Sequence, residues 1–237
     1  MLIQYTIVTI VLLSGIVWSI RAHKLTPVGA FTGGVIGLLL FIGAGFTGLA
    51  MMTLFFLLGT AATSWKKGVK ELRGIAEENK KGRTAGQVIA NAGVPALLAG
   101  SVLLFPSWTH QSRLMIAAGF ASAAADTVSS ELGNVYGTRY FNILTGRKDG
   151  RGLDGVVSIE GTLFGIAASA AIAVVYAIGF GWKNFLIIIL AGTLGNLLDS
   201  VLGATLERRQ VLNNDLVNFF NTLAAALAAL VLYHILD

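Results

Sequence analysis

The sequence predicts an all-α fold, a polytopic transmembrane bundle of about eight helices that forms a single integral membrane domain over residues 1–237. The first observation is composition: 55% of the residues are hydrophobic and only 12% are charged, about half the charged share of a soluble globular protein. The second is a series of apolar stretches close to the roughly 20 residues that a membrane-spanning helix needs. The third is a one-sided distribution of Lys and Arg along the chain.

In chain order, the apolar stretches cover residues 2–20, 27–44, 48–63, 85–105, 114–136, 156–178, 182–206 and 215–236. The first is longer than the apolar region of a signal peptide and has no basic segment before it, so we expect a retained helix. The second and third are separated only by a glycine-rich turn at residues 43–46, which predicts a tight hairpin. No stretch alternates in the manner of an outer-membrane β-barrel strand.

The basic residues support this count of helices. The connections after the first, third, fifth and seventh stretches hold 15 of the 17 Lys and Arg residues, whereas the opposite face has only Arg113 and Lys183. The positive-inside rule then places the basic face in the cytoplasm and both termini outside a cell membrane. Because topology accounts for the basic residues, the net charge of +5 does not indicate a nucleic-acid partner.

Two basic cytoplasmic loops, residues 64–84 and 137–155, are long enough to carry structure of their own. The first mixes Lys, Arg and Glu, which fits either an amphipathic helix or a loop that binds lipid head groups. The second contains the run GRKDGRGLDG at residues 146–155. Its glycines can adopt positive φ and direct backbone N–H groups toward an anion, although a merely flexible connection would have the same composition.

Two short segments resemble each other at an offset of 73 residues, ADTV at 125–128 and LDSV at 198–201. Each places an Asp late in a helix that runs inward, after a helix that runs outward from a basic loop. This is the pattern of a parallel repeat of helix hairpins with a site between them, or it is a chance match of four residues.

Ionisable side chains within apolar spans cost about 2.5–3.5 kcal/mol each on insertion scales and therefore suggest function. They are Asp126, Glu131, Glu160, Asp199 and Asp215, and the predicted topology places all of them at the cytoplasmic level. Carboxylates that face Lys and Arg suit Mg²⁺ together with substrate phosphates. The alternative is that some acids only cap helices or form ion pairs, which fits Asp215 at a helix start and Glu207 beside Arg208 and Arg209.

The residues also exclude several chemistries. The chain has no Cys, so it has no disulfide or zinc–thiolate site, and its three His residues are far apart. Neither the G-x-x-x-x-G-K-[ST] phosphate loop nor the G-x-S-x-G hydrolase motif occurs. A nucleotide would therefore have to bind within the membrane domain.

The segment ADTVSSELG at residues 125–133, followed by GTR at 137–139, resembles the signature of the integral-membrane phytyl-phosphate kinases, relatives of the CTP-dependent polyprenol kinases. The same pattern continues in AEE at 76–78, GR at 82–83, QVIAN at 87–91, DGVVS at 154–158, GT at 161–162 and NDLVNF at 214–219. The resemblance spans residues 66–222. It departs at residues 142–151, where the family is richer in Pro and Thr.

The resemblance implies a kinase that transfers the γ-phosphate of a nucleotide, typically CTP, to a prenyl monophosphate such as phytyl or geranylgeranyl phosphate. It implies catalytic roles for Asp126, Asp199 and Asp215, and a Mg²⁺ site formed by these residues with Glu131. The nucleotide- and phosphate-binding residues that we expect are Lys66, Lys70, Arg83, Gln87, Asn91, Ser129, Ser130, Gly133, Arg139, Ser158, Asn214 and Asn218.

Two other functions remain open. A secondary transporter would place its acids near the membrane midplane with access from both sides, whereas these acids crowd one face. A membrane cytidylyltransferase would use the same nucleotide and metal but would release pyrophosphate. A non-enzymatic scaffold would not need several buried acids.

Overall fold

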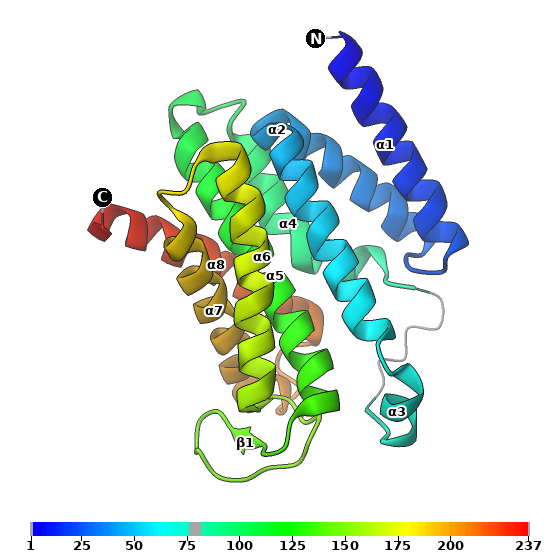
Figure 1. The fold of residues 1–237 in the computed structure, drawn as a ribbon, viewed down its shortest axis with the longest axis vertical. Coiled ribbons are helices and arrows are strands. Elements are labelled where there is room, and N and C mark those ends of the chain that lie inside the picture. The colour runs from blue at the N-terminus through cyan, green and yellow to red at the C-terminus, as the bar shows by residue number, and fades with distance from the viewer. Residues whose placement is uncertain (1, 76–81, 237) are drawn as a thin grey trace.

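The computed structural model describes residues 2–75 and 82–236 and confirms the all-α class (Figure 1). In chain order, the elements are α1 (Leu2–Arg21), α2 (Pro27–Ser64), α3 (Lys67–Leu72), α4 (Ala85–Ser101), the 3₁₀ turn η1 (Pro106–Trp108), α5 (Thr109–Tyr136), β1 (Phe141–Asn142), β2 (Val156–Val157), α6 (Ile159–Phe180), α7 (Phe185–Leu202), the π-helical turn η2 (Gly203–Glu207) and α8 (Asn214–Leu236). Each predicted apolar stretch corresponds to a long helix once the two arms of α2 are counted separately. Residues 76–81 of the predicted 64–84 loop, which include the AEE block, lie outside the described residues.

The chain reverses direction within α2 at Gly45, as the glycine-rich turn predicts. Gly45 has φ 62° and ψ −156°, a conformation that glycine adopts without a steric penalty, and Figure 1 shows the two arms on either side of it. The arms pack closely, since a Cβ on Gly37 would lie 3.1 Å from the Met52 side chain. The turn also packs on α4, where a Cβ on Gly43 would lie 2.5 Å from the Ala99 carbonyl oxygen.

Five helical segments of the described chain are able, by length and apolar composition, to cross a membrane: α1, α2, α6, the segment α7–η2 and α8. α4 falls short of that length with 17 residues, and α5 is more polar. However, α5 is the central helix, and its residues 114–125 are almost completely buried by neighbouring helices. A helix enclosed in this way does not face lipid, so its polarity is compatible with a multi-pass membrane bundle.

Two predicted helix boundaries are wrong near the polar end. The predicted helix 156–178 begins only at Ile159, because β2 pairs with β1 as a short antiparallel ladder. Ser158 then caps α6 by accepting a 3.1 Å hydrogen bond from the Gly161 N–H. The predicted helix 182–206 ends as a regular α-helix at Leu202 and continues as η2. The short helix α3 agrees with the helical one of the two alternatives for the 64–84 loop.

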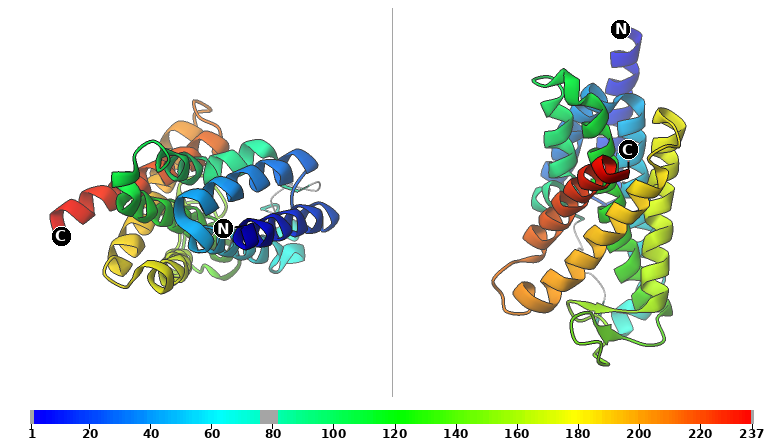
Figure 2. Two further views of the ribbon diagram at one scale, coloured as in Figure 1. Left: turned by 90° about the horizontal axis from the view of Figure 1, so that it is seen from above. Right: turned by 90° about the vertical axis from the view of Figure 1, so that its left-hand side faces the viewer.

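A close contact between α5 and α6 positions the polar end of the bundle. Gly133 on α5 faces Gly161 on α6, and a Cβ on Gly161 would lie 2.7 Å from the Ser129 carbonyl oxygen. Small residues allow membrane helices to approach in this way. As a result, the C-terminal ends of α5 and α7 gather with α3 and β1 at one end of the molecule, opposite the N-terminus (Figures 1 and 2).

Candidate active site

A cavity of about 500 Å³ opens at this end of the bundle, where α5 and α7 end and α4, α6 and α8 begin. Its lining is rich in carboxylate, amide and hydroxyl groups, and we term it the polar cavity. The predicted site residues that line it are Arg83, Gln87, Asn91, Asp126, Ser129, Ser130, Glu131, Gly133, Ser158, Asp199, Asn214 and Asn218. The fold thus brings most of the predicted residues together.

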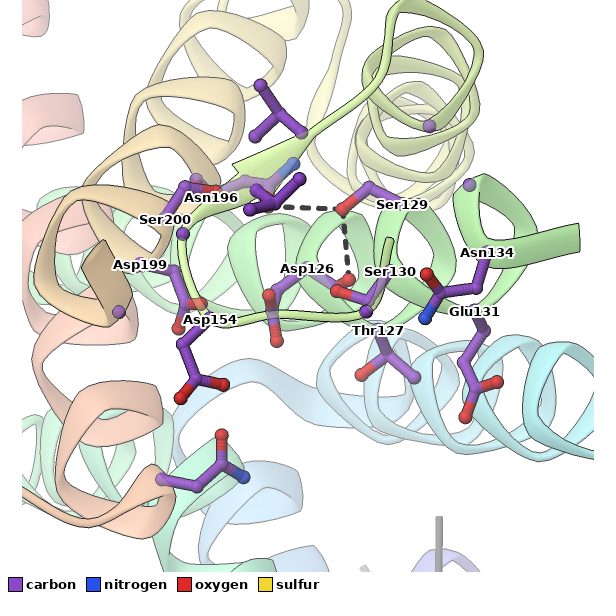
Figure 3. A pocket seen from close by; sticks show the side chains of 18 of the residues that line it. Asp126, Thr127, Ser129, Ser130, Glu131, Asn134, Asp154, Asn196, Asp199 and Ser200 are labelled. Carbon is purple, nitrogen blue, oxygen red and sulfur yellow. Dashed lines mark hydrogen bonds between the residues drawn. The ribbon is translucent and has the colours of Figure 1, made fainter. Parts of the chain in front are cut away.

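Asp126 on α5 and Asp199 on α7 lie side by side in the polar cavity (Figure 3). Their carboxyl groups are close enough to interact directly. Asn221 on α8 donates a 2.8 Å hydrogen bond to Asp199 Oδ1 and accepts one of 3.1 Å from Ser122 Oγ. The acids of the ADTV and LDSV segments therefore meet, and Asn221, which is not among the predicted site residues, holds one of them in place.

Two further acids, Asp154 and Glu207, complete a group of four carboxylates. Both line the polar cavity, and Asp154 repels both Asp199 and Glu207 electrostatically. Figure 3 shows the Asp154 side chain beside those of Asp126 and Asp199. Asp154 was omitted from the predicted site because it lies in a loop rather than in an apolar span. The four carboxylates concentrate negative charge at the point where α5, α7 and the 137–155 loop converge.

The 137–155 loop is held over the polar cavity by contacts with α7 and with the residue after η2. Gly155 has φ 70°, and a Cβ there would lie 2.5 Å from the Ser200 carbonyl oxygen. Arg208 donates from Nε to the Asp154 carbonyl oxygen at 2.7 Å and from Nη2 to Asp149 Oδ2 at 2.9 Å. The hydrogen bond from Arg208 lowers the pKa of Asp149 below its ordinary value. The positive φ predicted for this glycine-rich run is found at Gly146, Gly152 and Gly155.

Arg83 brings positive charge to the same cavity. Its backbone is fixed to the α1–α2 connection, because its N–H donates to the Lys24 carbonyl oxygen at 2.9 Å and its own carbonyl oxygen accepts from the Thr26 N–H at 3.0 Å. Its guanidinium lies against Gly59, where a Cβ would be 3.1 Å from Nη1, and acts electrostatically on Asp126. Arg83 is therefore placed to meet an anionic group that enters the cavity.

Lys70 and Glu131, both predicted to contact ligands, form an ion pair with each other. Lys70 is 1% exposed, and its ammonium group also donates to the carbonyl oxygens of Ala62 (3.1 Å) and Thr63 (2.7 Å). All three of its N–H donors are thus used. Figure 3 shows Glu131 on the far side of the view from Asp154 and Asp199. This arrangement ties α3 to the ends of α2 and α5.

The polar cavity is not lined by the four other predicted site residues, Lys66, Lys70, Arg139 and Asp215. Lys66 Nζ lies 4.7 Å from the centre of the Tyr136 ring, and Arg139 is exposed in the 137–155 loop. Asp215 lies in the first turn of α8, where its Oδ2 would be 2.9 Å from a Cβ on Gly86. A carboxylate beside the N-terminal ends of α4 and α8 stabilises both helix dipoles.

The chemistry of the four carboxylates fits Mg²⁺, which prefers oxygen ligands. A cation would also relieve their mutual repulsion. Within residues 2–75 and 82–236, no three acidic or His side chains are arranged closely enough to hold a metal ion. The described side chains alone therefore do not form a complete metal site.

A family model described as "Integral membrane protein DUF92" matches residues 9–226. The chain belongs to the DUF92 family. The matched segment contains every residue that lines the polar cavity. Membership in this family identifies an integral membrane protein. The function of the polar cavity has to be argued from the residues that line it.

Several curated proteins are similar to this DUF92 chain. An uncharacterized membrane protein of Synechocystis is 36% identical over 86% of this chain and 81% of its own length. The chloroplastic protein VTE6 of Arabidopsis thaliana is 31% identical over 84% of this chain and 62% of its own length. An uncharacterized membrane protein of Methanocaldococcus jannaschii is 29% identical over 90% of this chain and 87% of its own length. No solved structure matches the chain significantly.

Proposed function

We propose that this DUF92 protein is a membrane kinase that transfers the γ-phosphate of a nucleotide to a prenyl monophosphate, such as phytyl or geranylgeranyl phosphate, to give the diphosphate. The observation that carries the proposal is the group of four carboxylates that shares the polar cavity with Arg83 at one end of a membrane bundle. CTP as the nucleotide, and a prenyl phosphate as the acceptor, rest on the resemblance of the sequence blocks to the phytyl-phosphate kinases.

The reaction requires positioning and charge neutralisation rather than a strong base, because a monophosphate oxygen is already anionic at neutral pH. That oxygen attacks the γ-phosphorus and forms a new P–O bond, while the bond from the γ-phosphorus to the bridging oxygen breaks. The nucleoside diphosphate leaves with the electron pair. Arg83 would bind the acceptor phosphate, and the side-chain amides of Gln87 and Asn91 would orient it. Mg²⁺, when bound with the nucleotide beside Asp126 and Asp199, supplies positive charge to the phosphates.

The position of the cavity favours an enzyme over a transporter. A transporter site would lie near the middle of the bundle and be reached from both sides, whereas the polar cavity lies at the end formed by α3, β1 and the last turns of α5. The distribution of Lys and Arg predicts that the basic end of the bundle lies on the cytoplasmic side of a cell membrane. Soluble nucleotide would then reach the cavity directly.

Labelled nucleotides test the reaction and separate it from that of a cytidylyltransferase. Purified protein in lipid nanodiscs is incubated with Mg²⁺, prenyl monophosphates of several lengths, and CTP or ATP labelled on either the α- or the γ-phosphate. We expect the γ label in the lipid product and the α label in the nucleoside diphosphate. A cytidylyltransferase would transfer the α label to the lipid and release the γ label in pyrophosphate. Failure to label lipid with either nucleotide would contradict the proposal.

Removal of Mg²⁺ should weaken nucleotide binding, because the phosphates and the four carboxylates would then repel one another. By linkage, nucleotide should tighten Mg²⁺ binding by the same factor, and Mg²⁺ alone should bind weakly. Calorimetry with CTP and ATP, with and without Mg²⁺, measures both effects. A response to Na⁺ or to a pH gradient, with no nucleotide binding, would support the transporter instead.

A further inference from the structure

A second cavity, of about 250 Å³, lies between α1 and the α2 hairpin. We term it the apolar cavity because aliphatic and aromatic side chains dominate its lining, among them Leu12, Ile16, Trp18, Ile36, Met52 and Phe56. Arg83, Gln87 and Asn91 line both this cavity and the polar cavity. The two cavities therefore meet at these three polar residues.

The apolar cavity extends from Arg83 along α1. The α1 residues that line it run from Val11 to Ser19, about 12 Å along the helix axis, and Leu25, just beyond α1, forms a backbone bridge with Arg83. Val11 and Trp18 are also 50% and 48% exposed on the outer surface. Because α1 lies at the edge of the bundle against α2 (Figure 1), this cavity borders the surface that faces lipid.

We propose that the apolar cavity holds the isoprenoid tail of the lipid monophosphate while its phosphate reaches Arg83 and enters the polar cavity. This inference rests on the proposed function and adds the route by which a membrane lipid arrives at that site. A tail that moves from the bilayer into this cavity stays in apolar surroundings, so no hydrocarbon is exposed to water. The phosphate then meets the guanidinium that the two cavities share.

Two glycines line the apolar cavity at positions where an added side chain would meet open space. Gly15 on α1 and Gly33 on α2 both line it, and a Cβ at either position would meet no atom within 4 Å. A side chain at either position is therefore accommodated without displacing the backbone, and because both residues line the apolar cavity, we expect a leucine there to narrow it. Substitution at these positions narrows the proposed tail site and leaves the four carboxylates untouched.

Photo-crosslinking locates the tail independently of turnover. The full-length protein in nanodiscs is irradiated with geranylgeranyl monophosphate that carries a diazirine in its tail, or with a phospholipid that carries a diazirine in its acyl chain. We expect the prenyl probe to label residues 11–19, 30–36 and 49–57, and unlabelled prenyl monophosphate to compete. Label confined to other segments, or equal label from the phospholipid without competition, would overturn the inference. Competed label here without phosphoryl transfer would support the tail site and contradict the proposed function.

Gly15→Leu and Gly33→Leu test the same cavity by kinetics. We expect the KM for geranylgeranyl monophosphate to rise about tenfold or more, because a misfit of one methylene group in an apolar pocket already has an effect of this size. The KM for nucleotide and for a five-carbon prenyl monophosphate should not change. Gly100→Leu is the matched control, because Gly100 lines neither cavity and its Cβ would lie 4.0 Å from the Leu39 side chain. Equal effects on short and long substrates, or no effect on the long one, would overturn the inference.

Discussion

Asp126 and Asp199 each lie against another carboxyl group within a helix bundle. Stability alone does not favour such a pair, because two carboxylates at close range repel each other. A ligand that brings positive charge between the two groups removes the conflict. The contact between the two carboxyl groups is therefore a stronger argument for function than the number of acids in the membrane spans.

Asp126→Asn and Asp199→Asn should each lower kcat/KM by about 10²–10³-fold, the usual loss when one preorganised electrostatic partner is removed. The unfolding temperature should stay the same or rise, because the amide keeps the shape of the side chain and removes the repulsion. Glu71→Gln is the control, since Glu71 is exposed on α3 and pairs with Lys67 at 3.8 Å. Turnover close to wild type in both Asp variants would remove this pair from the active site.

Lys70→Met should lower the free energy of unfolding by about 3–5 kcal/mol, because it leaves Glu131 without its partner in a largely buried site. Lys67→Met is the matched control on the same helix, where a surface pair contributes about 0.2–1 kcal/mol. Adding Glu131→Gln to Lys70→Met should recover part of the loss, as measured by thermal unfolding. Unchanged stability with weaker nucleotide binding would instead support the phosphate-binding role that we expect for Lys70 from the sequence.

At the scale of elements, Arg208 connects the end of η2 to the 137–155 loop. Arg208→Ala should expose this loop, so that limited proteolysis within residues 146–153 becomes several-fold faster and nucleotide binding weakens. Arg209→Ala is the matched control, because Arg209 is the next residue and makes neither of these hydrogen bonds. Equal protection of the loop in the two variants would contradict the role of Arg208.

The pH dependence of this protection follows from Asp149. Because the hydrogen bond from Arg208 lowers the pKa of Asp149, the folded loop favours the ionised carboxylate. This hydrogen bond stabilises the folded loop at pH values above the pKa of Asp149 in the unfolded chain, near 3.8. The stabilisation is lost as pH falls through the lower pKa that Asp149 has in the folded loop. The protease resistance of the wild-type loop should therefore persist down to about pH 4 and weaken only below that pH.

Hydropathy predicts the helices because a chain in lipid must satisfy every backbone N–H and C=O group internally. The same reasoning does not predict the position of Asp154 beside Asp199. That position depends on the close packing of Gly155 against Ser200, and no local sequence pattern indicates this contact. Asn221 could have been predicted, because an amide within an apolar helix is the same kind of signal as an acid. The role of Lys70 depends on the way α3 folds back, which a mixed-charge loop sequence does not indicate.

For the whole molecule, the described basic residues have different roles at the two ends. Arg113 is part of the packing at the end near the α2 turn, where its Nε lies 3.5 Å from the Gly43 carbonyl oxygen and its guanidinium 4.7 Å from the centre of the Phe180 ring. Arg83 and Arg208 instead serve the polar cavity at the other end. The end of the molecule that is rich in Lys and Arg, from which the topology is predicted, is therefore also the end that holds the proposed site.

Single cysteines can establish the orientation without background, because the native chain has no Cys. Ser107 in η1 and Lys148 in the 137–155 loop are both exposed and lie on either side of α5 along the chain. In intact cells, a membrane-impermeant maleimide should label Ser107→Cys but should label Lys148→Cys only after the membrane is opened, because the basic loops stay in the cytoplasm.

Lys67→Cys on α3 provides a second cytoplasmic position at the end that holds the polar cavity, and it should behave as Lys148→Cys does. Labelling of Ser107→Cys and Lys148→Cys from the same side would mean that α5 does not cross the membrane. The reverse pattern would place the four carboxylates outside, away from the cytoplasmic nucleotide pool. A kinase in that orientation would have no phosphate donor, so the labelling pattern tests the proposed function as well as the topology.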